Sequence, residues 1–326
     1  MRHATIIGTG SYLPDHVITN DDMAKIVDTS DEWIAPRTGI RERRISTGEN
    51  TSDLAYRAAA RALHNAGIAA AELDLIICAT ITPDSFMPST ACMVQEKLGA
   101  DKAAAFDLTA ACTGMVYAMA IANSFIQSGM YTNILVIGAE TLSKVLDWSD
   151  RTTCVLFGDG AGAVIVSASD AGPGILSFHL VSDGSKQDFL CLPAVELGNP
   201  FVRREKEKFL PSISMKGQEV FKFAIRSITE LVRIVLLKAE LPEDEIKYIV
   251  AHQANLKIIE GAAKSLGLPI EKFYVNIDRY GNTSAATIGI ALDEMVQNGS
   301  LQAGDKIILV GFGGGMTSGA ILIEWS

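Results

Sequence analysis

Cys112 stands where a reactive cysteine would be expected. It follows the strand-like run Ala104–Leu108 and precedes the helix-like run Thr113–Ser128, which Gly129 closes. A cysteine in the first turn of a helix faces unpaired N–H groups and the positive end of the helix dipole. Such a position can lower a thiol pKa from about 8.5 to roughly 3.5–7.5 and so supply a thiolate at neutral pH. A small buried apolar side chain is the equally weighted alternative.

The cysteines as a set favour a reducing compartment. They are odd in number and widely spaced, with no C-x-x-C pair: Cys78, Cys92, Cys112, Cys154 and Cys191. This spacing is typical neither of a disulfide framework nor of a zinc site. The other four lie in or beside apolar strand-like or helix-like runs, and we interpret them as structural.

His252 and Asn282 are the partners that a reactive cysteine would need. His252 directly follows the strand-like run Tyr248–Ala251, and Asn255 after it can cap the next helix. Sites of α/β sheets lie at the carboxyl ends of parallel strands. Asn282 lies in a second strand-to-helix turn, YGNTSAAT, the internal counterpart of the Cys112 turn. A structural histidine and a helix-capping asparagine are the ordinary alternatives, but if the halves pack face to face, the three side chains converge on one pocket.

A glycine-rich segment, GFGGGMTSG at 311–319, follows the strand-like run KIILV. Consecutive glycines let a backbone approach a substrate closely and direct N–H groups at it. The segment lacks the G-K-[ST] ending of a P-loop. GDGAGA at 158–163 is followed by a strand where a dinucleotide-binding fold needs a helix. No cluster has metal-ligand spacing, so we expect no metal.

Strand-like and helix-like runs alternate along the chain, which indicates an α/β fold. Nearly continuous Val, Ile and Leu in the strands indicates sheets covered on both faces. The predicted strands are Thr5–Ile7, Leu73–Thr80, Ala104–Leu108, Ile134–Ile137, Ala163–Ser167, Ile175–Leu180, Tyr248–Ala251, Phe273–Val275, Lys306–Val310 and Ala320–Ile323. The predicted helices are Ser52–Asn65, Thr90–Leu98, Thr113–Ser128, Gly217–Ala239, Leu256–Leu266 and Ser284–Gln297.

The two halves of the chain resemble each other. LDLIICAT matches IKYIVAHQ, NILVIGAE matches KIILVGFG, and GAGAVIVSA matches SGAILIEWS, in the same order. This predicts a duplicated α/β chain with a pseudo-twofold axis and halves 1–172 and 173–326, divided at the turn-rich SDAGPG. The charged stretch Phe201–Lys208 is predicted to be an exposed loop.

Composition excludes several classes of protein. With 48% hydrophobic and 20% charged residues, the chain of 326 residues is not disordered. A net charge of −10 disfavours nonspecific binding to nucleic acid or anionic membranes. The uncharged run Leu108–Ala139 is interrupted by polar residues, which argues against a membrane span. The N-terminal apolar stretch is too short for a signal peptide. We therefore expect a cytoplasmic protein with no nucleic-acid or membrane partner.

The sequence closely resembles the β-ketoacyl-[acyl-carrier-protein] synthase III family over essentially its whole length. The shared motifs are DTSDEWIAPRTGIRERR (28–44), DLTAACTGMVYA (107–118), FGDGAGAV, HQAN (252–255), GNTSAA (281–286) and GFGGGMTSG. The resemblance implies the thiolase fold, with duplicated halves in α-β-α-β-α layers, a homodimer, and a triad of Cys112, His252 and Asn282. It also implies no cofactor, since the CoA thioester is a substrate.

The implied reaction has two stages. An acyl-CoA primer, acetyl-CoA by expectation, acylates Cys112, with the oxyanion held by the N–H groups of Cys112 and Gly314. Malonyl-[acyl-carrier protein] then decarboxylates, and its enolate attacks the thioester to give 3-oxoacyl-[acyl-carrier protein], which initiates type II fatty-acid synthesis. Thiolate is the nucleophile that thioester exchange needs. Neutral His252 and the Asn282 amide could each donate an N–H to the enolate oxygen without becoming a base, each donor being worth about 2.7–4 kcal/mol.

The resemblance also implies a CoA site. Trp33 and Arg151 would enclose the adenine and Arg37 would meet the phosphates, although surface ion pairing is the ordinary role of exposed arginines. The remaining CoA-binding residues implied are Thr29, Gln218, Asn255 and Phe312.

Primer choice and carrier-protein docking follow from the same resemblance. Met87, where the family often has Phe, would close the partner's acyl pocket, and its flexible thioether could admit a longer or branched primer. Lys222, Lys257 and Lys264 would dock the acidic carrier protein. Four features depart from the family pattern: Lys257, where Arg is common; Gln218, where Asn is common; Met316, where an aromatic residue is common; and the loop Val195–Leu210.

Two other functions stay open. One is a homologous synthase of secondary metabolism with a different primer. The other is a non-catalytic module that binds acyl-CoA or carrier protein, against which the intact triad argues.

Overall fold

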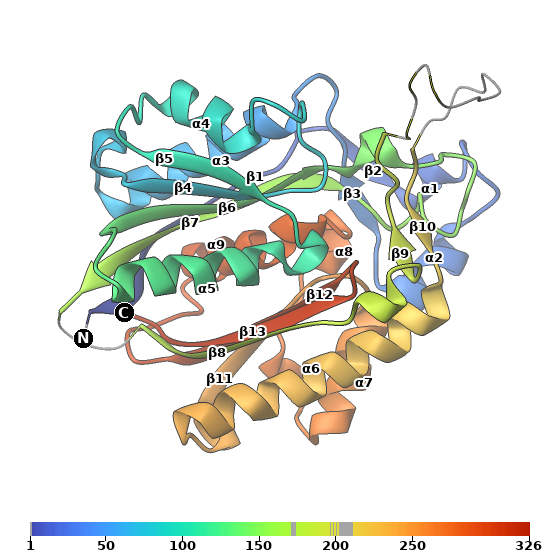
Figure 1. Cartoon of the computed structure of the whole chain (residues 1–326). Helices are drawn as coiled ribbons and strands as arrows, with labels where there is room; N and C mark the ends of the chain where they lie inside the picture. The colour runs from blue at the N-terminus through green and yellow to red at the C-terminus, as the bar shows by residue number, and fades with distance from the viewer. Residues whose placement is uncertain (1, 171–173, 196, 198, 200, 202–210) are drawn as a thin grey trace.

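The computed structural model describes residues 2–170, 174–195, 197, 199, 201 and 211–326. Two sheets lie one above the other, with helices between them and on both outer faces (Figure 1). This is the α-β-α-β-α layering that the family resemblance implies, and it covers both faces of each sheet, as the apolar strands predicted. Among the described residues, no helix combines the length and the hydrophobicity that crossing a bilayer requires.

The first sheet has five strands in the order β1-β7-β6-β4-β5. β4 is parallel to β5 and β6, whereas β7 is antiparallel to β1 and β6. Helices α3 and α4 cover its outer face, and α5 and α9 cover its inner face (Figure 1). The bounds are β1 His3–Tyr12, β4 Leu75–Ala79, β5 Ala104–Leu108, β6 Asn133–Thr141, β7 Asp159–Ser169, α3 Thr51–Ala66, α4 Thr90–Leu98, α5 Gly114–Gln127 and α9 Thr287–Gln297.

The second sheet has the order β11-β12-β13-β8. β11 is parallel to β12, and the other pairs are antiparallel. Helices α6 and α7 cover its outer face, while α5 and α9 lie against its inner face (Figure 1). The bounds are β8 Ile175–Ser182, β11 Ile246–Ala251, β12 Lys306–Gly313, β13 Thr317–Glu324, α6 Gly217–Ala239 and α7 Leu256–Leu266.

The strand order of the first sheet recurs in the second. β8, β13, β12 and β11 take the places of β1, β7, β6 and β4. This recurrence is the duplicated strand order that the sequence repeats predicted. The predicted boundary between the halves 1–172 and 173–326 lies at 171–173, outside the described residues. Of the predicted loop Phe201–Lys208, only Phe201 is described, and it is exposed. Residues 196, 198, 200 and 202–210 of the departing loop Val195–Leu210 are likewise not described.

The predicted strand Phe273–Val275 is wrong. Only Phe273 pairs, through an isolated parallel bridge to Ile249. The side chain of Gln253 satisfies the backbone beyond it: Nε2 donates to Tyr274 O (3.0 Å) and Oε1 accepts from Asn276 N (3.1 Å). Because a side chain takes these bonds, no strand forms, and the short helix α8 (Ile277–Tyr280) follows.

Helix α2 (Asp31–Thr38) was not predicted as an element. It begins at Ser30, whose Oγ accepts from Trp33 N, and it ends at Gly39, which has φ +82°. This is the glycine-terminated left-handed cap that commonly closes helices. Helix α2 belongs to an insertion between β1 and α3 that also contains β2 (Val17–Thr19), α1 (Asn20–Met23) and β3 (Glu42–Arg44). A separate two-stranded sheet is formed by β9 (Leu190–Cys191) and β10 (Ser214–Met215).

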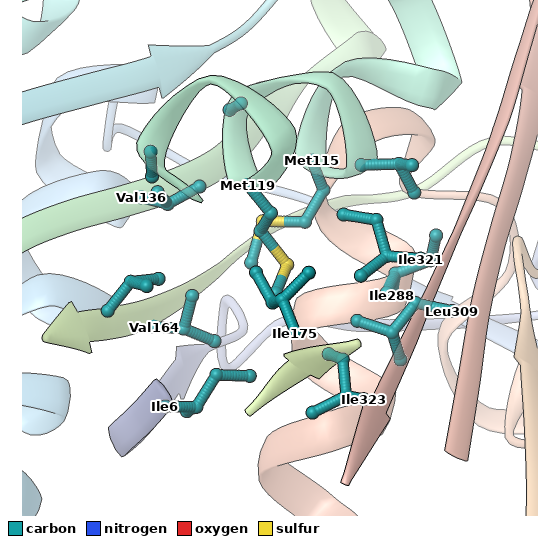
Figure 2. Close-up of a cluster of buried hydrophobic side chains, with 14 of the residues drawn as sticks. Ile6, Met115, Met119, Val136, Val164, Ile175, Ile288, Leu309, Ile321 and Ile323 are labelled. Carbon is teal, nitrogen blue, oxygen red and sulfur yellow. The ribbon is translucent and has the colours of Figure 1, made fainter. Parts of the chain in front are cut away.

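The largest core cluster lies between the two sheets. Met115 and Met119 of α5 meet Ile288 of α9, with Val136 of the first sheet and Leu309 of the second around them (Figure 2). All five side chains are 1% exposed or less. Because α5 and α9 are held between two sheets, the positions of their N-terminal ends are fixed.

Candidate active site

Cys112 lies in a sharp turn at the N-terminal end of α5. It occupies the 3₁₀ segment η2 (Ala111–Thr113), and Ala111 immediately before it has φ +46°. A left-handed alanine costs about 1–3 kcal/mol, which the surrounding packing must offset. A Cβ on Gly313 would lie 2.7 Å from Cys112 N. The glycine loop therefore lies too close to this turn for any side chain at position 313.

A second turn of the same kind precedes α9. In the 3₁₀ segment η7 (Ser284–Ala286), Ser284 has φ +49°, as Ala111 does in the first turn. The predicted correspondence between the two turns is therefore seen in the backbone. By position, however, the counterpart of Cys112 is Ala285, and Asn282 lies three residues earlier. The two turns contact each other at the centre of the molecule.

Asn282 is held in one orientation. Its Oδ1 accepts from Ser284 N over 2.8 Å, which leaves the NH₂ group as the end that can donate to a substrate. Its backbone is tied to the FGDG motif, because Gly158 N donates to Asn282 O (3.0 Å) and Asn282 N donates to Leu156 O (2.9 Å).

His252 is buried at the end of β11 and bonded to the same turn. Its Nδ1 lies 2.7 Å from Thr287 Oγ1, and Thr287 Oγ1 donates to Ser284 O over 3.0 Å. Both bonds form at once only if Nδ1 carries the proton, so Nε2 carries a lone pair. Burial lowers the pKa of His252 to about 3, which keeps the ring neutral. The structure thus differs from the expectation that the neutral ring donates: the proton of this tautomer goes to Thr287.

The Cys112 thiol is not ionised by its helix end. Burial raises its pKa to about 12, against a hydrogen bond with Ser284 that lowers it, while the charge of Glu140 raises it further. The expected lowering is therefore wrong for this state. Cys112 is 5% exposed, and the loss of hydration is the largest cause of the raised pKa.

Three residues of this centre were not identified from the sequence: Glu140, Ser284 and Thr287. Ser284 connects the set, because it contacts Cys112, Asn282, Thr287 and Glu140. Ser284 and Thr287 lie inside the motif YGNTSAAT. Glu140 ends the apolar strand NILVIGAE, and an acidic residue at the end of a doubly covered strand is the signal that could have revealed it.

Gly314 lies beside the Cys112 turn. A Cβ on it would lie 3.6 Å from the Ala111 Cβ. Thr317 Oγ1 bonds both Gly314 O and Ala110 O at 3.1 Å, so it ties the glycine loop to the turn. This placement suits the predicted role of the Gly314 N–H as an oxyanion donor.

Two arginines lie over the ring of Trp33. The guanidinium carbons of Arg37 and Arg151 are 5.0 and 5.3 Å from the centre of its ring. Arg151 also pairs with Asp28 at 3.2 Å, the ordinary surface role considered for it. The Oγ1 of Thr29 is buried and has no hydrogen-bond partner within the described part of the chain, so a bound ligand could satisfy it.

The other predicted CoA-binding residues, Phe312, Asn255 and Gln218, lie on three different elements of the second half. Phe312 is 2% exposed and packs edge-on against His252, with ring centres 5.0 Å apart. Asn255 caps α7, because its Oδ1 accepts from Lys257 N over 2.8 Å. Gln218 is exposed at the start of α6.

The predicted docking lysines are exposed on the outer helices. Lys222 lies on α6, whereas Lys257 and Lys264 lie on α7. Lys222 lines a groove of about 490 Å³ together with Arg226 and Arg233, which were not predicted. Met87 is 87% exposed in the segment between β4 and α4. In the part of the chain that the structure describes, no group of three or more His, Cys, Asp or Glu side chains is placed to hold a metal ion.

Comparisons with known proteins agree with these motifs. Residues 106–184 match the family model "3-Oxoacyl-[acyl-carrier-protein (ACP)] synthase III", and residues 236–325 match the model of its C-terminal part. The chain is 56% identical to the β-ketoacyl-[acyl-carrier-protein] synthase III of Clostridium acetobutylicum over the full length of both. It is 49% identical to the crystal structure of 3-oxoacyl-[acyl-carrier-protein] synthase III from Aquifex aeolicus, with a TM-score of 0.93 over 99% of this chain and all of that one. It is also similar to the priming β-ketosynthase of a polyketide pathway, at 34% identity and a TM-score of 0.92 over 99% of this chain and 96% of that one.

Proposed function

The chain belongs to the 3-oxoacyl-[acyl-carrier-protein] synthase III family, and from that premise we propose how its own residues carry out the condensation. The protein is a condensing enzyme of the acyltransferase class that initiates type II fatty-acid synthesis. It transfers an acyl group from CoA to Cys112 and then joins that group to the two-carbon unit of malonyl-[acyl-carrier protein]. The observation that carries the assignment of residues is the turn at Ser284, which bonds Cys112 and Asn282 and, through Thr287, His252.

In the first stage the Cys112 sulfur attacks the primer thioester. The carbonyl oxygen becomes an oxyanion, which the N–H groups of Cys112 and Gly314 stabilise. Both groups belong to tightly packed backbone at the meeting of η2 and the glycine loop, so they do not have to reorganise during the reaction.

In the second stage the malonyl group loses CO₂ and its thioester oxygen becomes negative. The Asn282 NH₂ is the donor that the structure holds ready for that oxygen. His252 donates to it only after Nε2 has taken a proton, which the negative charge of the malonyl group favours. The resulting enolate attacks the Cys112 thioester, and the sulfur leaves.

The arginines around Trp33 and the basic helices serve the two substrates. The CoA adenine enters between Trp33 and Arg151, with its phosphates near Arg37 and the pantetheine passing Thr29 and Asn255; Gln218 and Phe312 complete the CoA-binding set that the family pattern implies. The acidic carrier protein docks on Lys222, Lys257 and Lys264. The groove beside Lys222 supports this docking face, because its lining carries a net positive charge: Arg226 is paired with Glu230, and Lys222 and Arg233 add positive charge beside that pair.

We infer a homodimer from the edge of the first sheet. Among the strands that the structure describes, β5 pairs only with β4, so its other edge offers backbone groups to a second copy. Phe86 and Met87 are 80% and 87% exposed in the segment that leads to α4, which is unusual for large apolar side chains outside an interface. In the dimer Met87 would close the partner's acyl pocket. Cysteines that are all unpaired favour a cytoplasmic site of action.

A synthase of secondary metabolism is the second candidate, because the chain is also similar to a priming ketosynthase of a polyketide pathway. Primer preference separates the two functions. A flexible methionine at position 87 leaves room for primers longer than acetyl.

The test is to trap the acyl-enzyme. Wild-type protein incubated with labelled acetyl-CoA should carry one acyl thioester on the Cys112 peptide by mass spectrometry, and the exposed Cys191 provides an internal control that should carry none. A competition among acyl-CoAs of different length and branching then identifies the primer. Preference for acetyl-CoA supports fatty-acid initiation, and exclusive use of an unusual primer supports the second candidate. No adduct on Cys112 with any acyl-CoA would leave only the non-catalytic binding module.

A further inference from the structure

The Cys112 thiol must lose a proton before it can attack the primer, and this inference rests on that proposed step. Burial holds the thiol in its neutral form, so a nearby base has to take the proton. Two groups of the centre are candidates. One is His252, whose Nδ1 is bonded through Thr287 to the Ser284 carbonyl and whose Nε2 carries the lone pair. The other is the carboxylate of Glu140, which is bonded to the Ser284 hydroxyl.

Glu140 is a completely buried carboxyl group at the end of β6, with no exposed area. Its oxygens accept bonds from Thr80 Oγ1 (3.1 Å), Thr82 Oγ1 (2.5 Å) and Ile81 N (3.1 Å). Its Oε1 also accepts from Ser284 Oγ over 3.1 Å. Buried carboxylates need such donors, and the Ser284 hydroxyl is also hydrogen-bonded to the Cys112 side chain, which connects Glu140 to the nucleophile.

Ser284 has a single hydroxyl proton, which goes to Glu140. The same oxygen is therefore an acceptor for the Cys112 S–H, and a hydrogen bond joins the two side chains. The left-handed backbone of Ser284 brings this hydroxyl between the thiol and the carboxylate. The chain of contacts runs from S–H to Oγ–H to carboxylate oxygen without a gap.

We propose that Ser284 and Glu140 form a proton relay that deprotonates Cys112. The S–H bond breaks as its proton passes to Ser284 Oγ, and the Ser284 proton passes to Glu140 Oε1, so the net charge of the group does not change. The sulfur electron pair then attacks the primer, the C–S bond to CoA breaks, and the CoA thiolate takes a proton from solvent. When condensation later expels the Cys112 sulfur, the proton held on Glu140 returns through Ser284.

Glu140 is a better acceptor than His252. Burial raises the pKa of Glu140 to about 7, whereas burial lowers the pKa of His252 to about 3. A base is most effective when its pKa lies near the working pH. Transfer to Glu140 also moves a negative charge along the relay without creating a new one, whereas transfer to His252 would create a separated ion pair inside a dry site.

Other ionisable groups face Glu140 from its neighbours. They are the thiol of Cys78 on β4, the thiol of Cys112 on η2 and the ammonium of Lys144 in the segment after β6. Cys78 and Cys112 are uncharged near neutral pH because burial raises both pKa values. Lys144 is the cation among them.

The test measures the rate of Cys112 acylation against pH in Glu140→Gln and Ser284→Ala. A base acts when deprotonated, so the wild-type rate should rise as the pH passes about 7. Glu140→Gln should lose this rise and be about 10²-fold slower or more at pH 8, and Ser284→Ala should be similarly slow. Glu140→Asp, which keeps the carboxylate, should recover part of the rate. Asp293→Asn is the matched control, because it alters a buried carboxyl bonded to Thr9 and Ser11, and its pH profile should equal that of wild type.

A second measurement uses the wild-type protein, so it does not depend on whether a variant folds. The proton stays on Glu140 in the acyl-enzyme, so an infrared difference spectrum of wild type before and after acylation should show a new protonated-carboxyl band. Absence of that band, or acylation of both variants within twofold of wild type, would overturn the relay. Failure of wild type itself to form a Cys112 thioester would instead overturn the proposed function.

Discussion

The Asn282 carboxamide has only one orientation available to it, because Ser284 N–H donates to its Oδ1 over 2.8 Å. Its NH₂ group is thereby committed to the substrate side. His252 is bound just as firmly, but through Nδ1, so Nε2 begins the reaction without a proton. The two side chains therefore enter the decarboxylation step in different states, one ready to donate and one not.

Asn282→Ala should separate the two stages of the reaction. We expect malonyl decarboxylation to fall about 10²–10³-fold, since a preorganised donor is lost, while primer transfer to Cys112 stays within a few-fold. Release of ¹⁴CO₂ from labelled malonyl-[acyl-carrier protein] and acyl-enzyme mass spectrometry measure the two stages.

Asn282→Asp sharpens this experiment, because it keeps an acceptor for Ser284 N–H but has no NH₂ to donate. It should lose decarboxylation as Asn282→Ala does. Asn65→Ala, which removes an amide bonded to Thr9 O, is the control and should retain both stages. Equal loss of the two stages in the Asn282 variants would contradict this division of roles.

The turns at the starts of α5 and α9 pack closely against neighbouring strands, and this close packing requires glycine at the points of contact. A Cβ on Gly138 of β6 would lie 2.1 Å from Ala285 O, a distance that no packing tolerates. A Cβ on Gly162 of β7 would lie 2.5 Å from the Gly289 carbonyl carbon of α9. Glycine at these contacts allows η7 and α9, which belong to the second half of the chain, to lie directly against the first sheet.

Gly138→Ala should therefore push η7 away from β6. We expect a loss of stability of about 1–3 kcal/mol from overpacking, together with slower acylation, because Ser284 moves relative to Cys112. Chemical denaturation and the acylation assay measure the two effects. Gly184→Ala is the matched control, since its added Cβ would meet nothing within 4 Å. A Gly138→Ala protein with unchanged stability and acylation rate would refute the close contact.

The molecule as a whole leaves one edge of the first sheet open. β5 has no partner on its outer side among the described strands, and the apolar Phe86 and Met87 protrude from the segment between β4 and α4. A second copy that adds its own β5 would remove both features at once, since pairing satisfies a free edge and covers apolar surface.

Phe86→Asp should weaken this dimer, because a charge would be buried in the interface. We expect wild type to sediment as a dimer at micromolar concentration and the variant to shift toward monomer in analytical ultracentrifugation. Leu237→Asp is the control, because Leu237 is also apolar and 79% exposed but lies on α6 in the outer layer. A wild-type protein that sediments as a monomer would exclude an obligate dimer through this edge.

Elements with local end signals were predictable from the sequence. α4 and α7 have the predicted bounds, because Ser89 and Asn255 cap their starts and Gly99 and Gly267 close their ends. β5 and α6 also have the predicted bounds. The predicted strand at Phe273 failed because the side chain of Gln253, distant in sequence, takes the backbone bonds that a strand would have used.

The motifs alone indicated the three residues Cys112, His252 and Asn282, because each stands at a recognisable turn. They could not indicate their protonation states or the buried carboxylate behind them. Those depend on burial and on hydrogen bonds between residues far apart in the chain, such as Ser284 with Glu140, which are 144 positions apart. A thiol at a helix end is acidic only while water or charge stabilises the thiolate, and folding two halves of one chain against each other removes that water.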